Sequence, residues 1–303
     1  MLARKPWIDA AGRGTAVPGS ARRRGGLFGL VLTLPMPVWQ TLFFAAPLGF
    51  LVVMSFWTVE NFQLTPDLSS ANWVRMYSAS YFWDTYLRTV LYAALASAVS
   101  SALALPCAYA LAFRVSPAAR RLVVFSLITP YFTSYLVRTY TWKIVLTERG
   151  IINTALGAVG LGPFAMTSNL FATMVGYLTL TLPIVILLQY FSLANIDRTL
   201  VEAAHNLGCG RLRTVFAVVL PAAKTGIVLA ATFAFILSFG DFVSPSFLGG
   251  SKPPTMSILM VDAVRSGSQW PRAAVVALTM VATLLAVAFA AMRAAYGPEK
   301  PRP

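Results

Sequence analysis

Six long apolar stretches, separated by shorter polar segments, dominate the pattern of hydrophobic and polar positions along this chain. Each is long enough to supply the roughly 20 mostly apolar residues that a membrane-spanning helix needs. They cover residues 29–57, 84–113, 122–146, 169–191, 225–249 and 271–296. Because an alternation of period two is absent, the stretches predict helices rather than barrel strands. The pattern therefore predicts an all-α integral membrane protein, with six transmembrane helices in a domain that covers residues 28–298.

Prolines interrupt the first and fifth stretches at Pro35, Pro37, Pro47 and Pro245, so the pattern does not fix the ends of these two helices. Residues 1–27 are rich in Gly, Ala and Arg, and we expect a disordered or cytoplasmic basic tail. A signal peptide is the alternative reading. The apolar stretch that follows is far longer than the h-region of a signal peptide and lacks a clean A-x-A site, which favours a retained first helix.

Composition and charge agree with a membrane protein and predict its orientation. Hydrophobic residues make up 57% of the chain and charged residues 11%, with a mean hydropathy of +0.70. Sixteen Lys and Arg residues lie in the N-terminal tail, the second and fourth loops and the C-terminus, whereas five lie in the opposite loops. The positive-inside rule therefore places both termini in the cytoplasm. The net charge of +14 does not indicate nucleic-acid binding, because the charges flank apolar spans, where anionic lipids attract them.

Residues suited to catalysis or metal binding are scarce. His205 is the only histidine, and Cys107 and Cys209 do not have the spacing of a disulfide framework or a metal site. The chain has no G-x-x-x-x-G-K-[ST] loop for ATP. We expect no catalytic residue, metal or cofactor in this chain, which argues against a membrane enzyme. A secondary transporter would need ion-coupling groups at mid-membrane and inverted repeats, and neither is evident.

The segment between the fourth and fifth stretches, residues 192–224, carries the most informative polar motif. Its pattern predicts two short helices with a glycine break between them. Asp197 or Thr199 can serve as the N-cap of the first helix, and Thr199 with Glu202 fits the S/T-x-x-E capping box.

The residues after this cap predict a compact hairpin. Ala203 and Ala204 give the first helix a flat face that another protein could approach closely. Gly208 and Gly210 can take the positive φ that a sharp turn needs. Pro221 then stops the second helix or starts the next span.

This spacing resembles the EAA loop of permeases from importers of the ATP-binding-cassette (ABC) class: E-A-A, three residues, G, nine residues, I-x-L-P. The matching positions are Glu202, Ala203, Ala204, Gly208, Leu220 and Pro221, with Val218 where the family usually has isoleucine. In that family the loop is a cytoplasmic coupling helix, which sits in a cleft of the ATPase subunit. The resemblance implies that the ATPase-coupling residues here are Glu202, Ala203, Ala204, Leu207, Gly208 and Arg211. The alternative is an ordinary capped helix in which Glu202 is only a capping partner.

The third and fifth stretches hold polar and aromatic residues that suggest a substrate path. Tyr131, Tyr135, Arg138 and Trp142 are spaced i, i+4, i+7 and i+11, so on one continuous helix they share a face. Pro130 and the aromatic run suggest that this helix is bent and lines a cavity. An arginine at membrane depth needs a partner or water, and the alternative is an interfacial belt from which Arg138 reaches the headgroups.

Asp241 and Phe242 lie between Gly240 and Pro245, where a broken helix would expose backbone carbonyls to a cavity. Alternatively, the helix ends at Gly240 and leaves Asp241 in an external, hydrated loop. Carboxylates and aromatic rings suit a polyammonium ion, but an unpaired Arg138 would repel one. We therefore hypothesise that Asp241 or Glu148 neutralises Arg138. If neither does, an anionic solute becomes the better prediction.

Further stretches resemble the spermidine/putrescine branch of these permeases. They are residues 87–89, 136–142, 240–245, 248–250 and 269–271. The resemblance covers about residues 84–290 and implies a type I importer permease of six helices, with the coupling helix between helices 4 and 5. It also implies a bacterial inner membrane location and a heterodimer with a second permease subunit. Two cytoplasmic ATPase subunits would hold ATP and Mg, and a periplasmic solute-binding protein would deliver the substrate.

The implied activity is import of polyamines, or of a related small organic solute, by alternating access. Related branches carry ferric iron, aminoalkylphosphonates and opines, so the substrate stays open between these classes.

Overall fold

The computed structural model describes residues 33–297, and most of this part of the chain is helical. The predicted basic tail, residues 1–27, lies outside the described residues. Within them, four helical segments are long and apolar enough to cross a membrane: Pro35–Met54, α5 (Ser80–Phe113), α9 (Leu170–Ala194) and α16 (Trp270–Tyr296). Two bent pairs of helices bring the total to six if each pair is one span. The prediction of six spans is thus confirmed.

The first span remains helical despite its prolines, because its hydrogen bonding changes before Pro47. It consists of α2 (Pro35–Gln40), the π-helix η1 (Thr41–Ala45) and α3 (Ala46–Met54). The Ala46 N–H donates to the carbonyl of Thr41, five residues back, as in a π-helix. Such a local change of register lets a helix accommodate a residue that has no N–H to donate.

A short hairpin follows, in which β1 (Thr58–Glu60) pairs antiparallel with β2 (Gln63–Thr65), and Val59 lies opposite Leu64. Helix α4 (Ala71–Tyr77) then leads into α5.

The third predicted stretch does not form one straight helix. Helix α6 (Pro117–Ile128) continues into the 3₁₀ turn η2 (Thr129–Phe132), and α7 (Tyr135–Leu146) is followed by α8 (Ile151–Ala158). The two halves are bent by 96°. The predicted bend is therefore confirmed, but the prediction of a continuous helix face from Tyr131 to Trp142 is wrong. Thr133 is extended and Ser134 is non-helical, and these two residues separate η2 from α7.

A second break lies just before the fifth predicted stretch, residues 225–249. A segment formed by α11 (Arg211–Thr214), the π-helix η3 (Val215–Val219) and α12 (Leu220–Ala222) meets α13 (Lys224–Gly240) at 77°. Pro221 lies within this segment, and the break comes two residues later at Ala223. After α13 come α14 (Val243–Phe247) and α15 (Met256–Arg265), which precede α16.

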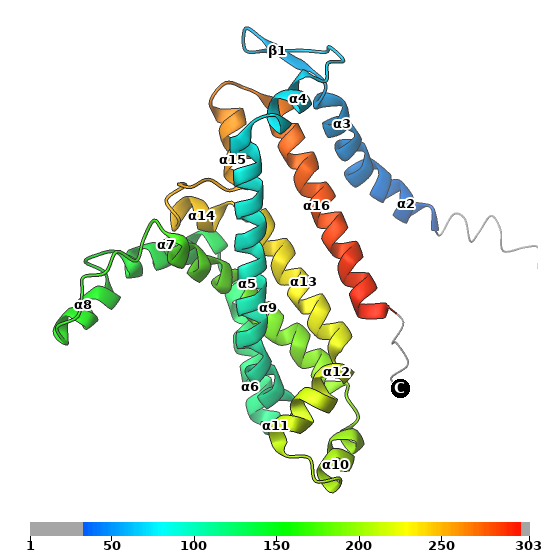
Figure 1. Ribbon diagram of the computed structural model, residues 1–303, viewed down its shortest axis with the longest axis vertical. Coiled ribbons are helices and arrows are strands. Elements are labelled where there is room, and N and C mark those ends of the chain that lie inside the picture. The colour runs from blue at the N-terminus through cyan, green and yellow to red at the C-terminus, as the bar shows by residue number, and fades with distance from the viewer. Residues whose placement is uncertain (1–32, 298–303) are drawn as a thin grey trace, which may run out of the picture. The chain divides into compact units, whose positions relative to one another are not determined.

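Helices α5, α9 and α13 pack closely on one another through small side chains (Figure 1). Ala104 of α5 and Ala230 and Ala234 of α13 are fully buried with Val185 of α9. Small residues let helix backbones approach closely where lipid provides no hydrophobic driving force.

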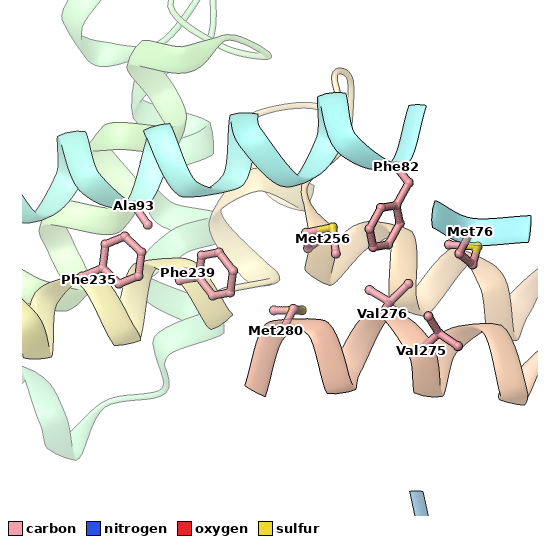
Figure 2. Packing of buried hydrophobic residues seen from close by; sticks show 9 residues of the cluster. All are labelled: Met76, Phe82, Ala93, Phe235, Phe239, Met256, Val275, Val276 and Met280. Atoms are coloured by element: carbon pink, nitrogen blue, oxygen red, sulfur yellow. The ribbon is translucent and has the colours of Figure 1, made fainter. Parts of the chain in front are cut away.

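A second cluster joins α4 and α5 to α13, α15 and α16. Figure 2 shows Phe82 of α5 and Met256 of α15 beside Val276 and Met280 of α16, with Phe235 and Phe239 of α13 farther along α5. These contacts fix α15 and α16 against the three-helix core.

Candidate functional site

The segment predicted as a coupling loop forms a short helix, α10 (Arg198–Asn206), whose N-cap is Asp197. The Asp197 carboxylate accepts a hydrogen bond of 3.0 Å from the backbone N–H of Thr199. Hydrogen bonds from Thr199 lower the pKa of Asp197 below its usual range, because they stabilise the charged form. Since Thr199 is already the second residue of the helix, the predicted capping box of Thr199 with Glu202 is wrong.

The C-terminal end of α10 is a Schellman motif, a turn in which two amides bond back to helix carbonyls. The N–H of Cys209 donates to the carbonyl of Ala204, and the N–H of Gly208 donates to that of His205. Gly208 has φ +81°, in the left-handed region that favours glycine, as predicted. Gly210 has φ −66° and is the N-cap of α11, so the positive φ predicted there is wrong.

The two alanines of the motif have different environments. Ala204 is only 6% exposed, whereas Ala203 is exposed. Val201 packs against a cluster formed by the ends of α5 and α9 and by Val219 of η3. The prediction that Ala203 and Ala204 form one face for a partner is therefore corrected, because Ala204 is covered by its own chain. The helix is thus seated on the ends of α5, α9 and α13.

An apolar ridge faces outward from α10. It consists of Leu200, Ala203 and Leu207, spaced i, i+3 and i+7, and Leu207 is 85% exposed. Glu202, Gly208 and Arg211 are exposed as well. Exposed apolar residues that gather on one helix face indicate a site of protein contact. Apart from Ala204, the residues that the motif predicted for ATPase contact are all accessible.

A second polar site lies where α13 ends in the membrane domain. The Tyr135 hydroxyl donates to the Asp241 carboxylate at 2.6 Å and forms a further hydrogen bond with the Ser244 hydroxyl. The same carboxylate accepts the backbone N–H groups of Val243, at 2.8 Å, and Ser244, at 3.2 Å. Asp241 is 8% exposed. Helix α13 does end at Gly240, but the reading of Asp241 as part of an external, hydrated loop is wrong.

Close packing of α14 against α9 holds this polar site together. A Cβ at Gly176 of α9 would lie 2.6 Å from Cβ of Ser244 and 2.9 Å from a methyl carbon of Leu248. Only glycine allows this approach. The prediction missed both Ser244 and Gly176. Asp side chains often accept backbone N–H groups two or three residues later, so the sequence contained a signal for a turn after Asp241 but none for the Ser244 hydroxyl.

Arg138 lies beside aromatic rings. Its guanidinium carbon is 5.9 Å from the ring centre of Tyr131 and 5.7 Å from that of Tyr135, within the range of cation–π contacts. Its Nε atom is buried without a hydrogen-bond partner. In the part of the chain that the structure describes, Arg138 forms no ion pair with Asp241 or Glu148. The hypothesised pair is not formed, and the Asp241 carboxylate instead accepts from the Tyr135 hydroxyl and two backbone amides.

The other predicted path residues are close by. Trp142 and Arg138 line a cavity of about 440 Å³ with Pro130 and Pro183. Phe242 is half-buried next to Asp241.

Six candidate spans, with a helical hairpin between the fourth and fifth, are the architecture of the permease subunit of a type I ABC importer. The chain belongs to the family of binding-protein-dependent transport system inner membrane components, which matches residues 100–299. It is therefore a multi-pass protein of the bacterial inner membrane that acts in transport and is not an enzyme.

Curated relatives and solved structures agree with this family. The chain is 26% identical over 263 residues to the spermidine/putrescine transport system permease protein PotB of Haemophilus influenzae. The alignment covers 84% of this chain and 90% of PotB. It is also 30% identical over 240 residues to the inner membrane ABC transporter permease protein YdcU of Escherichia coli. This alignment covers 74% of this chain and 75% of YdcU. Among solved structures, one chain of a bacterial ABC transporter involved in the import of the acidic polysaccharide alginate superposes on this chain with a TM-score of 0.74 and 15% sequence identity. The superposition covers 90% of this chain and 96% of that chain.

Proposed function

We propose that this chain is one of two permease subunits in an ATP-driven importer of polyamines. The observation that carries the proposal is its similarity to spermidine/putrescine permeases along most of both chains. The polar site supports it, because a buried carboxylate beside tyrosine rings is a suitable environment for an alkylammonium group.

Energy for transport would come from ATPase subunits that bind the apolar ridge of α10. Ala204 and Val201 seat this helix on the ends of α5, α9 and α13, so a force applied to the ridge would act directly on the spans. A partner can shift an equilibrium between inward-open and outward-open states only through contacts that differ between those states. ATP and Mg would lie on the two partner subunits, and both termini of this chain in the cytoplasm. A periplasmic binding protein would deliver the solute to the outer face.

The proposal is tested by transport in proteoliposomes that contain the complete transporter and its binding protein. We expect ATP-dependent uptake of radiolabelled putrescine or spermidine, which an excess of unlabelled spermidine suppresses. The Asp241→Asn variant should raise KM for the polyamine, because it removes the charge that attracts the ammonium group. Absence of polyamine uptake in a preparation that hydrolyses ATP normally would contradict the polyamine assignment.

A second candidate substrate is a small organic anion. Arg138 has no acidic partner among the described residues. Its guanidinium group forms cation–π contacts with two tyrosine rings instead. A further relative, 27% identical over 237 residues, is the sulfoquinovosyl glycerol transport system permease protein SmoG of Agrobacterium fabrum. Competition for uptake distinguishes the candidates, since an anion that displaces the labelled solute where spermidine does not would favour this alternative.

A further inference from the structure

A basic pocket lies between the C-terminal end of α5 and the coupling loop. Tyr109 and Phe113 form one wall, with their ring centres 5.0 Å apart. Helix α10 and the first residue of α11 form the other wall, and the pocket has a volume of about 540 Å³. This size is within the range of sites for small ligands.

Three arginines line this pocket: Arg114 after α5, Arg198 at the start of α10, and Arg211 at the start of α11. Glu202 is the one carboxylate in the lining, and His205 is the other group there that can carry positive charge. In the described part of the chain, none of the three arginines forms an ion pair. The pocket therefore carries a net positive charge, because its lining has three guanidinium groups and one carboxylate. Guanidinium groups match phosphate oxygens through paired N–H donors.

The pocket and the apolar ridge lie on different sides of α10. Successive residues of an α-helix are turned by about 100°, since 3.6 residues make one turn. Val201 and His205, which line the pocket, are therefore turned well away from Leu200, Ala203 and Leu207. A protein bound to the ridge would leave Tyr109 and Arg114 on the α5 side of the pocket accessible, whereas Glu202 and Arg211 also belong to the residues predicted for ATPase contact.

We infer that this arginine pocket (Arg114, Arg198 and Arg211, with Tyr109 and Phe113) binds the phosphate of an anionic ligand, which either a phospholipid headgroup or a free phosphate compound supplies. The inference rests on the proposed orientation, which places the end of α5 at the depth of the cytoplasmic headgroups. Basic pockets between transmembrane helices on that side suit phosphate headgroups. Aromatic residues at the pocket wall are typical of the same depth. A bound phosphate would join α5 to both helices of the loop.

The test uses the full-length chain in its intact complex, in nanodiscs of phosphatidylcholine that contain increasing fractions of phosphatidylglycerol. Bound phosphatidylglycerol is counted by native mass spectrometry, for the wild type and for the double variant Arg114→Gln/Arg198→Gln. The matched control is Arg213→Gln, which removes a cation of α11 that does not line the pocket. The variant Arg114→Lys/Arg198→Lys keeps the charge and shows whether the fold tolerates changes at these two positions. A parallel titration with inorganic phosphate distinguishes the two sources of the ligand.

Loss of two cations should weaken phosphatidylglycerol binding roughly 30-fold, on the basis of the usual contribution of each basic residue near a membrane surface. Arg213→Gln should bind like the wild type, and the lysine variant should bind nearly as well. Displacement of the lipid by millimolar phosphate would support the inference with a free phosphate compound as the ligand. Retention of the lipid under the same conditions would support it with a headgroup as the ligand. Equal binding by the glutamine variant and the wild type, or an equal loss in Arg213→Gln, would overturn it. None of these results depends on which solute is transported, so they are independent of the polyamine assignment.

Discussion

Replacing the glycine that ends α10 should uncouple transport, whereas replacing its neighbour two residues later should not. Both glycines are exposed, and a Cβ at either would meet nothing within 4 Å. Their backbones differ, because Gly208 has φ +81° and Gly210 has φ −66°. Alanine at Gly208 would therefore be strained by about 1–2 kcal/mol, and valine by more, whereas alanine at Gly210 would not be strained.

A penalty of that size changes the population of the Schellman turn about 5- to 30-fold. The turn sets the direction in which the chain leaves α10, so its loss would reorient the apolar ridge with respect to the spans. We expect Gly208→Ala to reduce uptake several-fold and Gly208→Val to reduce it to background. Gly210→Ala should stay within about twofold of the wild type.

The assay is ATP-dependent uptake in proteoliposomes, normalised to the amount of inserted protein, with ATP hydrolysis measured in the same sample. Uptake should fall while basal hydrolysis by the partner subunits persists. Wild-type uptake by Gly208→Val, or equal losses for the alanine variants at Gly208 and Gly210, would refute the assignment of Gly208 as the turn that orients the coupling helix.

Three further predictions concern the polar site and the cap of α10. Gly176→Ala should destabilise the membrane domain by about 1–3 kcal/mol, because the new methyl group would overlap Ser244, and a lowered melting temperature would show it. Tyr135→Phe should cost about 1–3 kcal/mol, because it removes a donor from the buried Asp241 carboxylate, and unchanged stability would contradict this. Because the folded pKa of Asp197 is lowered, its capping of α10 is fully present at neutral pH and should be lost as pH falls through that pKa. Fraying of α10, followed with a spin label, should depend on acid pH in the wild type and not in Asp197→Asn.

The apolar pattern was sufficient to predict the spans, because each helix in lipid must be long and apolar by itself. It could not predict the 96° bend after Phe132, since the spacing of Tyr131, Tyr135 and Arg138 fits a helix face whether or not the backbone continues. Pro130 indicated a bend but not its angle or its position at Thr133 and Ser134. The sequence therefore predicted which residues belong to the polar site better than it predicted their arrangement in space.

The coupling loop was predictable where the backbone alone decides the structure. Gly208 had to take a left-handed conformation after a capped helix, and it does. The orientation of Ala204 toward its own chain depended on the ends of α5 and α9, which lie far away in sequence. The same holds for Gly176, whose closeness to Ser244 arises only when α14 packs on α9. Such tertiary contacts leave no local pattern.

The central claim is that the apolar ridge of α10 contacts an ATP-hydrolysing subunit. The direct measurement is photo-cross-linking in intact cells, with a photoreactive amino acid in place of Leu207, which is 85% exposed. The control places the same amino acid at Leu68, which is 84% exposed in a loop on the proposed outer side. We predict that the probe at position 207 forms an adduct with a subunit that hydrolyses ATP and that the probe at position 68 does not. An adduct of that subunit at position 68, or its absence at position 207, would contradict the account.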